Sequence, residues 1–85
     1  MTVNGKAWPY PTDLCQVRNA WDAGLVVYQG FSSDPAATDA DAKWVIMKLH
    51  YDVSNQLTGI DFADSDDSPN KVWDDRASYT YQLDT

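Results

Sequence analysis

Glutamate is missing from this 85-residue sequence, in which all 13 acidic residues are aspartate. Glutamate favours helices, whereas aspartate favours caps and turns, so this composition predicts a chain built mostly of strands and tight connections. Basic residues are also few, and the formal net charge is −7. Because phosphate binding needs basic residues, this shortage argues against nucleic acid as a partner. It favours high solubility or a partner with a basic surface.

Cysteine is nearly absent as well. The single Cys15 excludes a disulfide within the chain, so the fold needs no oxidising compartment. No apolar run approaches the length of a membrane span. The opening stretch MTVNGKAWPYPTD lacks the apolar core of a signal peptide. We therefore expect a protein that is made and folded in a cytoplasm and has no membrane partner.

The length predicts one domain with a modest core. We expect residues 1–13 to form an extended N-terminal arm and residues 14–85 to form a single small β-rich domain. The prolines of WPYP disfavour a helix in the arm. The arm's aromatic residues, Trp8 and Tyr10, then either pack back on the domain or dock on a neighbour.

Strand signals recur along the rest of the chain. Runs of β-branched and aromatic residues predict strands at 25–33, 43–51, 57–63 and 78–83. Short helices are predicted at 13–23 and after Ser68–Pro69. Gly30, inside the first strand, indicates a bulge or a close backbone approach. The sequence DVSNQ, residues 52–56, has the turn chemistry of a hairpin.

These elements predict a mainly β fold, a small antiparallel sheet or meander that is β-sandwich-like or a half-barrel. Alternation along residues 43–51 separates two sets of side chains. The predicted core set is Val45, Met47, Leu49 and Tyr51, and the opposite set is Trp44, Ile46, Lys48 and His50. Ile60 and Phe62 are expected to join the core.

Metal and catalytic chemistry find little support in the sequence. Asp64, Asp66, Ser68, Asn70 and Asp75 fall at spacings typical of a calcium loop, but proline stands where that loop needs glycine. A solvated acidic loop is the favoured interpretation, and we expect no metal site.

Groups for acid–base catalysis or nucleophilic attack are equally sparse. Asp74 and Asp75 are adjacent, so their carboxylates do not naturally converge. His50 is the only histidine and has no second ligand or nucleophile near it in the sequence. No phosphate-binding glycine loop or nucleophile elbow occurs. We expect a protein that is not an enzyme and needs no cofactor.

The segment VWDDRASYTY, residues 72–81, is interpreted as a structural closing motif. Trp73 needs a buried position, and Arg76 can be neutralised by Asp74, by Asp75 or by another aspartate brought near. A short helix would then deliver Tyr79 and Tyr81 into a final strand, because aromatic residues at strand spacing usually belong to the core.

The second half of the chain resembles a family of small structural proteins of tailed-bacteriophage virions. The resemblance is carried by a strand led by Trp44 with Ile46 and Lys48, a Tyr51-Asp52 turn, Ala63-Asp64, and the VWDDRASYTY segment. The stretch YQGFSSDPAATDADAKW is similar to the family's lead-in to that tryptophan. The family's turn has glycine after YD, where this chain has Val53. The resemblance covers about two thirds of the chain and leaves out residues 1–20.

This resemblance implies a non-enzymatic virion protein of the capsid, neck or tail, such as a cement, connector or fibre-attachment component. Its partners would be other phage virion proteins, and it would be a homo-oligomer in the assembled particle. Candidate interface residues are Trp8, Tyr10, Trp44 and His50. The arm would reach across to an adjacent subunit.

The sequence is also compatible with two other functions. An acidic phage inhibitor could mimic DNA and bind a basic host protein. Its carboxylates would come from two loops that contain Asp34, Asp39, Asp41, Asp64, Asp66 and Asp67. A carbohydrate- or receptor-binding module is a third possibility, based on tryptophans and tyrosines on a sheet.

Overall fold

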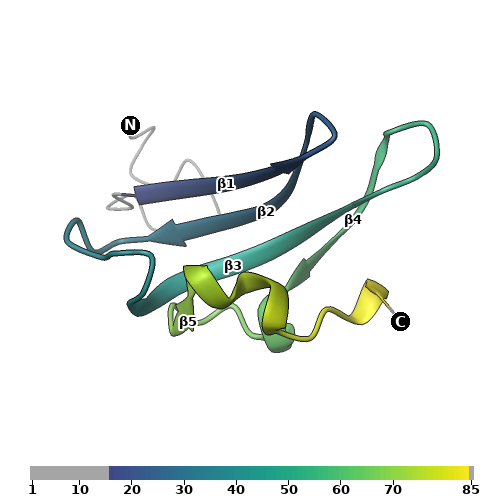
Figure 1. Ribbon diagram of the computed structural model, residues 1–85. Coiled ribbons are helices and arrows are strands. Elements are labelled where there is room, and N and C mark those ends of the chain that lie inside the picture. The colour runs from purple at the N-terminus through teal and green to yellow at the C-terminus, as the bar shows by residue number, and fades with distance from the viewer. Residues whose placement is uncertain (1–15, 85) are drawn as a thin grey trace, which may run out of the picture.

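A computed structural model describes residues 16–84 and shows a mainly β fold. Strands β1 (Gln16–Asp22), β2 (Leu25–Ser32), β3 (Ala42–Tyr51) and β4 (Leu57–Phe62) form an antiparallel meander in sequence order, and β5 (Lys71–Val72) pairs with the start of β3. Figure 1 shows this open sheet. The predicted antiparallel meander is confirmed. The predicted arm, with Trp8 and Tyr10, and Cys15 lie outside the described residues.

Three short 3-10 helices complete the fold. They are η1 (Ala63–Ser65), η2 (Trp73–Ser78) and η3 (Gln82–Asp84). Within residues 16–84, none of the helices has the length and apolar character needed to cross a bilayer. We call residues 71–84 the closing segment, which Figure 1 shows in green to yellow running alongside β3 toward the C-terminus.

The helix predicted at 13–23 is wrong over its described part, which forms strand β1. Ala23 and Gly24 both adopt positive φ angles, of 52° and 85°, and form a tight turn into β2. Turns of this kind match the right-handed twist of paired strands. Gln16–Asp22 then pairs antiparallel with β2, with a shift of register between Ala20 and Trp21. Strand pairing over the whole segment outweighs the weak helical spacing of its apolar residues.

The hairpin predicted at residues 52–56 is confirmed. The Asp52 carboxylate accepts hydrogen bonds from the backbone N–H groups of Ser54, at 2.8 Å, and Gln56, at 3.0 Å. Asn55 takes a positive φ of 62°, which asparagine tolerates better than most residues. The turn therefore forms through the aspartate chemistry that the sequence indicates.

The register of the strands divides their side chains between two faces of the sheet. The first face carries Arg18, Ala20, Tyr28, Gly30, Trp44, Ile46, Lys48, His50, Gly59 and Asp61. The second face carries Val17, Asn19, Gln29, Phe31, Val45, Met47, Leu49, Ile60 and Phe62. All the charged groups in these two sets lie on the first face.

The closing segment packs on the first face and forms the main core there. Trp44 and Ile46 are completely buried, and Trp73 and Tyr81 of the closing segment join them in one cluster. The predicted core side of β3 is therefore wrong, since the most buried residues belong to the opposite set. Met47 of the second face is also buried. The prediction assigned the wholly apolar set to the core, whereas Lys48 and His50 share the face that meets the core.

Two further sequence predictions in this region are corrected. Ile60 is 49% exposed on the second face, so it does not belong to the main core. Residues 78–83 form no strand, because Ser78 ends η2 and Gln82 begins η3. The tyrosine hydroxyls between these helices are engaged locally: Tyr79 bonds the Val72 N–H at 2.7 Å, and Tyr81 donates to the Arg76 carbonyl at 2.6 Å. Both bonds join residues of the closing segment itself, so they fix its local shape in place of strand pairing.

Candidate functional site

Trp73 rests directly over Gly30 at the centre of the first face. A β-carbon added at Gly30 would lie 2.6 Å from Cε3 of Trp73, closer than such atoms approach. The Trp73 ring is 6.4 Å from the Trp44 ring, with planes tilted by 46°. The close backbone approach predicted at Gly30 is thus confirmed, and its cause is the tryptophan of the closing segment. Trp73 occupies the buried position that the sequence predicted.

An arginine side chain also stacks on each of these two tryptophan rings. The Arg18 guanidinium lies 4.9 Å from the Trp44 ring centre, and that of Arg76 lies 4.7 Å from the Trp73 ring centre. Stacking of a guanidinium on an indole is a favourable cation–π contact. The Trp44 indole N–H donates to the Thr38 carbonyl at 2.9 Å, which satisfies its only donor.

Trp44 was expected at an interface, but its side chain is 0% exposed in the single chain. Its ring and its donor are both used inside the domain, so it is unsuited to a surface contact. His50 is largely buried too, with 15% of its side chain exposed. An interface role for His50, Trp8 or Tyr10 stays a prediction.

A charged cluster occupies the other end of the first face. His50 Nε2 lies 3.0 Å from Oδ2 of Asp61, and that oxygen also accepts the backbone N–H of Leu83 at 2.8 Å. The Lys48 ammonium donates to both Asp84 oxygens, at 2.9 and 2.7 Å. Asp84 also lies 3.8 Å from His50 Nδ1. Both carboxylates therefore tie β3 and β4 to the end of the closing segment.

The surroundings of Lys48 favour its charged form. Burial alone lowers the pKa of the Lys48 ammonium, but the hydrogen bond to Asp84 and the neighbouring Tyr28 and Asp84 outweigh it, so the pKa is raised. The ammonium also lies 5.6 Å from the ring centres of Tyr28 and Tyr81. A lysine held charged in this way binds a carboxylate well and is a poor base or nucleophile.

The acidic loop after β4 is organised around a lysine. The Asp66 carboxylate accepts the Ser68 N–H at 2.9 Å and the Lys71 ammonium at 3.0 Å. These bonds, the one from Ser68 first, hold the pKa of Asp66 well below its usual range. Among residues 16–84, no group of three or more His, Cys, Asp or Glu is placed to hold a metal ion. In place of a cation ligand set, the loop uses its carboxylate to anchor a buried lysine.

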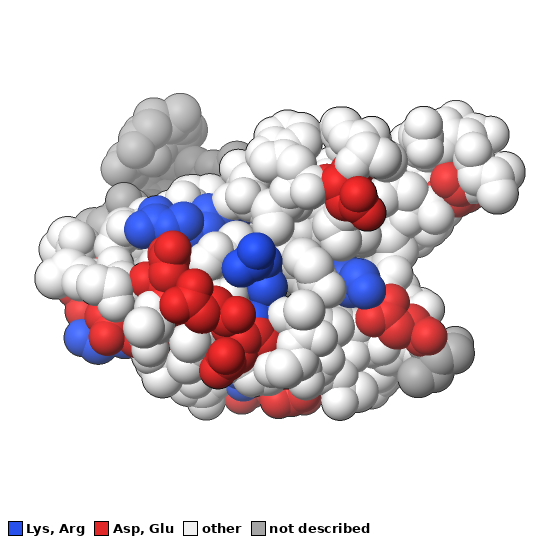
Figure 2. Space-filling view, in the orientation of Figure 1, with Lys and Arg blue, Asp and Glu red and all other residues white. Residues whose placement is uncertain are grey.

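Most of the loop carboxylates that a DNA mimic would need are used inside the domain. Asp34 pairs with Lys43 at 2.6 Å, and Asp39 pairs with Arg18 at 2.9 Å. In the view of Figure 2, basic groups lie beside several of the acidic ones. The bonds from Lys43 and from the Ala36 N–H lower the pKa of Asp34, so this carboxylate stays ionised for its structural role.

Arg76 differs from the other basic residues in this part of the chain. It was expected to pair with Asp74, Asp75 or another aspartate brought near, but it makes no ion pair within residues 16–84. Instead it stacks on Trp73 and donates to that residue's carbonyl at 3.2 Å. The remaining described cations all have a carboxylate partner, namely Arg18, Lys43, Lys48 and Lys71.

The comparisons with known proteins leave these features without a family assignment. No protein-family model matches the sequence, and no significantly similar chain was found among curated proteins or solved structures.

The partners of His50 and Lys48 could only be found from the structure. Asp61 and Asp84 lie 11 and 36 residues away from them in sequence, and only the strand register and the closing segment bring them together.

Proposed function

We propose that the protein is a non-enzymatic structural or assembly component of a tailed-bacteriophage virion and acts through protein–protein contacts. Support for the phage assignment comes from the sequence resemblance over the Trp44-led strand and the VWDDRASYTY segment. Support for the contact role comes from the second face of the sheet. That face is the single structural observation on which the contact role depends.

The paired residues of the second face combine a lack of charge with exposed apolar side chains on the two outer strands. None of its nine residues is charged. Val17 and Ile60, on the two outer strands β1 and β4, are each 49% exposed. An antiparallel sheet that faces water normally alternates apolar and polar residues, with the polar ones on the wet face. An uncharged second face is instead typical of a surface that meets other protein atoms.

The contacts of His50 favour a structural role over a catalytic one. Its partner Asp61 is also bonded to the backbone of Leu83, and the nearby Lys48 is bonded to Asp84. A general base must reach a substrate proton, whereas these groups are directed at the closing segment. The cluster is therefore better explained as a set of contacts that attach the C-terminal end of the chain to β3 and β4.

The proposal is tested by placing one charge on the second face. In Ile60→Lys, a charge on that face should dissociate the oligomer or weaken attachment to particles, because an unpaired charge is costly in an apolar contact. The matched control is Val53→Lys, which introduces the same charge at a fully exposed turn position. Analytical ultracentrifugation and co-purification with virions measure the two effects. A chain that is monomeric at every concentration and absent from virions would contradict the proposal.

The predicted arm is tested separately by deleting residues 1–12. If the arm contributes to assembly, the shortened chain should keep the sheet folded by circular dichroism and lose oligomers or particle attachment. Unchanged assembly would remove the arm from the proposal and leave the second face as its basis.

A further inference from the structure

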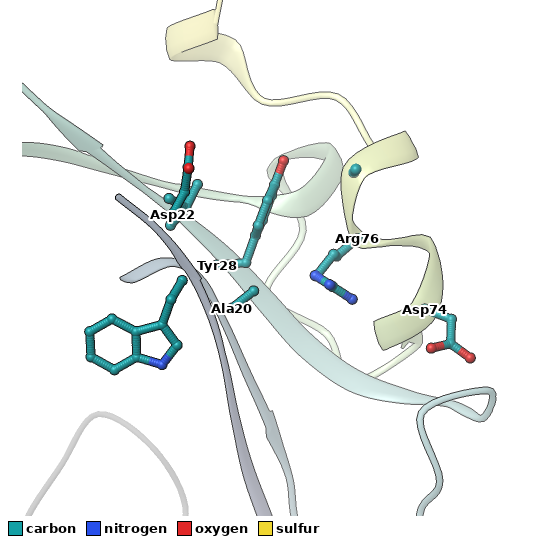
Figure 3. Close-up of a pocket in the computed structure, with 8 residues that line it drawn as sticks. Ala20, Asp22, Tyr28, Asp74 and Arg76 are labelled. Carbon is teal, nitrogen blue, oxygen red and sulfur yellow. The ribbon is translucent and has the colours of Figure 1, made fainter. Parts of the chain in front are cut away.

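A groove separates the β1–β2 hairpin from η2 on the first face. Its volume is about 380 Å³, which lies in the range of small ligand sites. Ala20, Val27 and Tyr28 form the strand side, and Asp74, Arg76 and Ala77 form the helix side. Figure 3 shows the Arg76 guanidinium pointing from η2 toward Tyr28 and Ala20. The groove therefore has an apolar and aromatic wall with one cation directed into it.

The Arg76 guanidinium is held in place but has bonding capacity left. Stacking on Trp73 fixes its plane, and a single donor is used by the Trp73 carbonyl. A guanidinium has five N–H donors, arranged as a fork that suits two oxygens of one carboxylate. In a chain of net charge −7, Arg76 is the one cation of residues 16–84 without a carboxylate partner.

The neighbouring charges limit what the groove can bind. Asp22 and Asp74 also line it, and Figure 3 shows their carboxylates lying to either side and pointing away from the Arg76 guanidinium. Two nearby negative charges disfavour a phosphate or another dianion, because like charges repel at this range. A single planar carboxylate satisfies the fork of Arg76 with the least repulsion.

From this geometry we propose that the groove between the β1–β2 hairpin and η2 binds a monoanionic carboxylate through Arg76. The carboxylate oxygens accept from the free Arg76 donors, and the carbon atoms next to them lie against Tyr28 and Ala20. The source is either an acidic side chain of a partner protein or a free small carboxylate. This inference goes beyond the proposed assembly role and depends on neither the second face nor the arm.

The test uses the full chain labelled with ¹⁵N and titrated with acetate, with acetamide as the neutral control. Acetate should give saturable shifts at the Arg76 side chain and at the amides of Ala20 and Ala77, and acetamide should not. Arg76→Gln should weaken acetate binding about tenfold or more, because it removes a charge-assisted bond. Lys43→Gln, which removes a cation that does not line the groove, should leave acetate binding unchanged.

A second variant keeps the test decisive if Arg76→Gln perturbs the fold. Asp74→Asn leaves the stacked arginine in place and removes one repelling charge, so acetate should bind about two- to threefold more tightly. Equal shifts with acetamide, or unchanged acetate affinity in both variants, would overturn the proposal.

The source of the carboxylate is decided with two blocked tripeptides, Gly-Asp-Gly and Gly-Asn-Gly. Tighter binding of the aspartyl peptide than of acetate supports an acidic side chain of a partner protein. Acetate binding that equals or exceeds binding of the aspartyl peptide overturns that source and assigns the groove to small carboxylates. Neither result bears on oligomer formation, so a failure here is distinguishable from a failure of the proposed function.

Discussion

The closing segment holds the first face of the sheet by different contacts at its two ends. At the tryptophan end, Trp73 packs on Gly30 and Trp44, and both tryptophans are at most 5% exposed. At the charged end, Lys48 and Asp61 bond to residues of the same segment, with 16–20% of their side chains exposed. Shape complementarity supplies the first attachment and hydrogen bonds between charged groups supply the second. The tryptophan end should therefore dominate stability and the charged end should respond to salt and pH.

The largest expected effect on stability comes from removing the Trp73 side chain at the tryptophan end. Trp73→Ala should lower the free energy of unfolding by about 3–5 kcal/mol, because it removes buried area and leaves a cavity over Gly30. The matched control is Trp21→Ala at a tryptophan that is 66% exposed, where a loss below about 1 kcal/mol is expected. Urea denaturation measures both, and equal losses would contradict the ranking of the two sites.

A smaller effect is expected at the charged end. Asp61→Ala should cost about 1–3 kcal/mol, because the Leu83 N–H and His50 lose their common acceptor. Asp67→Ala serves as control, since Asp67 is exposed and its side chain makes no hydrogen bond within residues 16–84. Hydrogen exchange at the Leu83 amide should accelerate in Asp61→Ala alone. Unchanged exchange there would show that Asp61 does not fasten the segment.

The hydroxyl of Tyr81 lies between the tryptophan end and the charged end of the closing segment. Its ionisation makes the stability of the fold decrease at alkaline pH. Burial raises the pKa of this phenol above its usual value, with smaller contributions from neighbouring charges. The folded state then keeps its proton where the unfolded chain loses it, so the contribution is complete below about pH 10 and declines as pH rises. Lys48, whose pKa is also raised, acts in the same direction.

Tyr81→Phe should therefore cost about 1 kcal/mol at neutral pH, through loss of the bond to the Arg76 carbonyl. It should also weaken the fall in stability above about pH 10. Urea denaturation between neutral and alkaline pH measures both effects. An identical alkaline decline in wild type and variant would exclude Tyr81 as its source.

The smallest effect is expected from the Lys48–Asp84 ion pair. Asp84 is 42% exposed, so Asp84→Asn should cost less than about 1 kcal/mol. Because exposed pairs are screened, the difference from wild type should shrink in about 0.5 M NaCl. A loss that does not change with salt would mean that Asp84 acts through something other than charge.

The sequence predicts the parts of this fold that depend on local signals. The strand with Gly30, the Asp52 hairpin and the burial of Trp73 all follow from residues close together in the chain. The side of β3 that meets the core was predicted wrongly, because Lys48 and His50 are charged or polar and yet lie beside Trp44 and Ile46. Their burial is possible because Asp84 of the closing segment and Asp61 of β4 supply carboxylates.

The candidate groove could not be predicted for a related reason. It needs β1, which the sequence presents as a helix, to pair with β2, and it needs η2 to lie beside the resulting hairpin. The position of Arg76 was misjudged because adjacent aspartates suggest an ion pair, whereas stacking on Trp73 directs the guanidinium away from them. Contacts between distant segments decide both features, and no local pattern encodes them.

The central claim is that the closing segment is positioned by Trp73 fitting against the bare backbone of Gly30. A double-mutant cycle with Gly30→Ala and Trp73→Leu, followed by urea denaturation, tests it most directly. In the wild-type background Gly30→Ala should cost about 1–3 kcal/mol, since the added methyl meets the indole. With leucine at position 73 the cost should fall close to zero, which corresponds to a coupling of similar size. An equal cost of Gly30→Ala in both backgrounds would contradict the account.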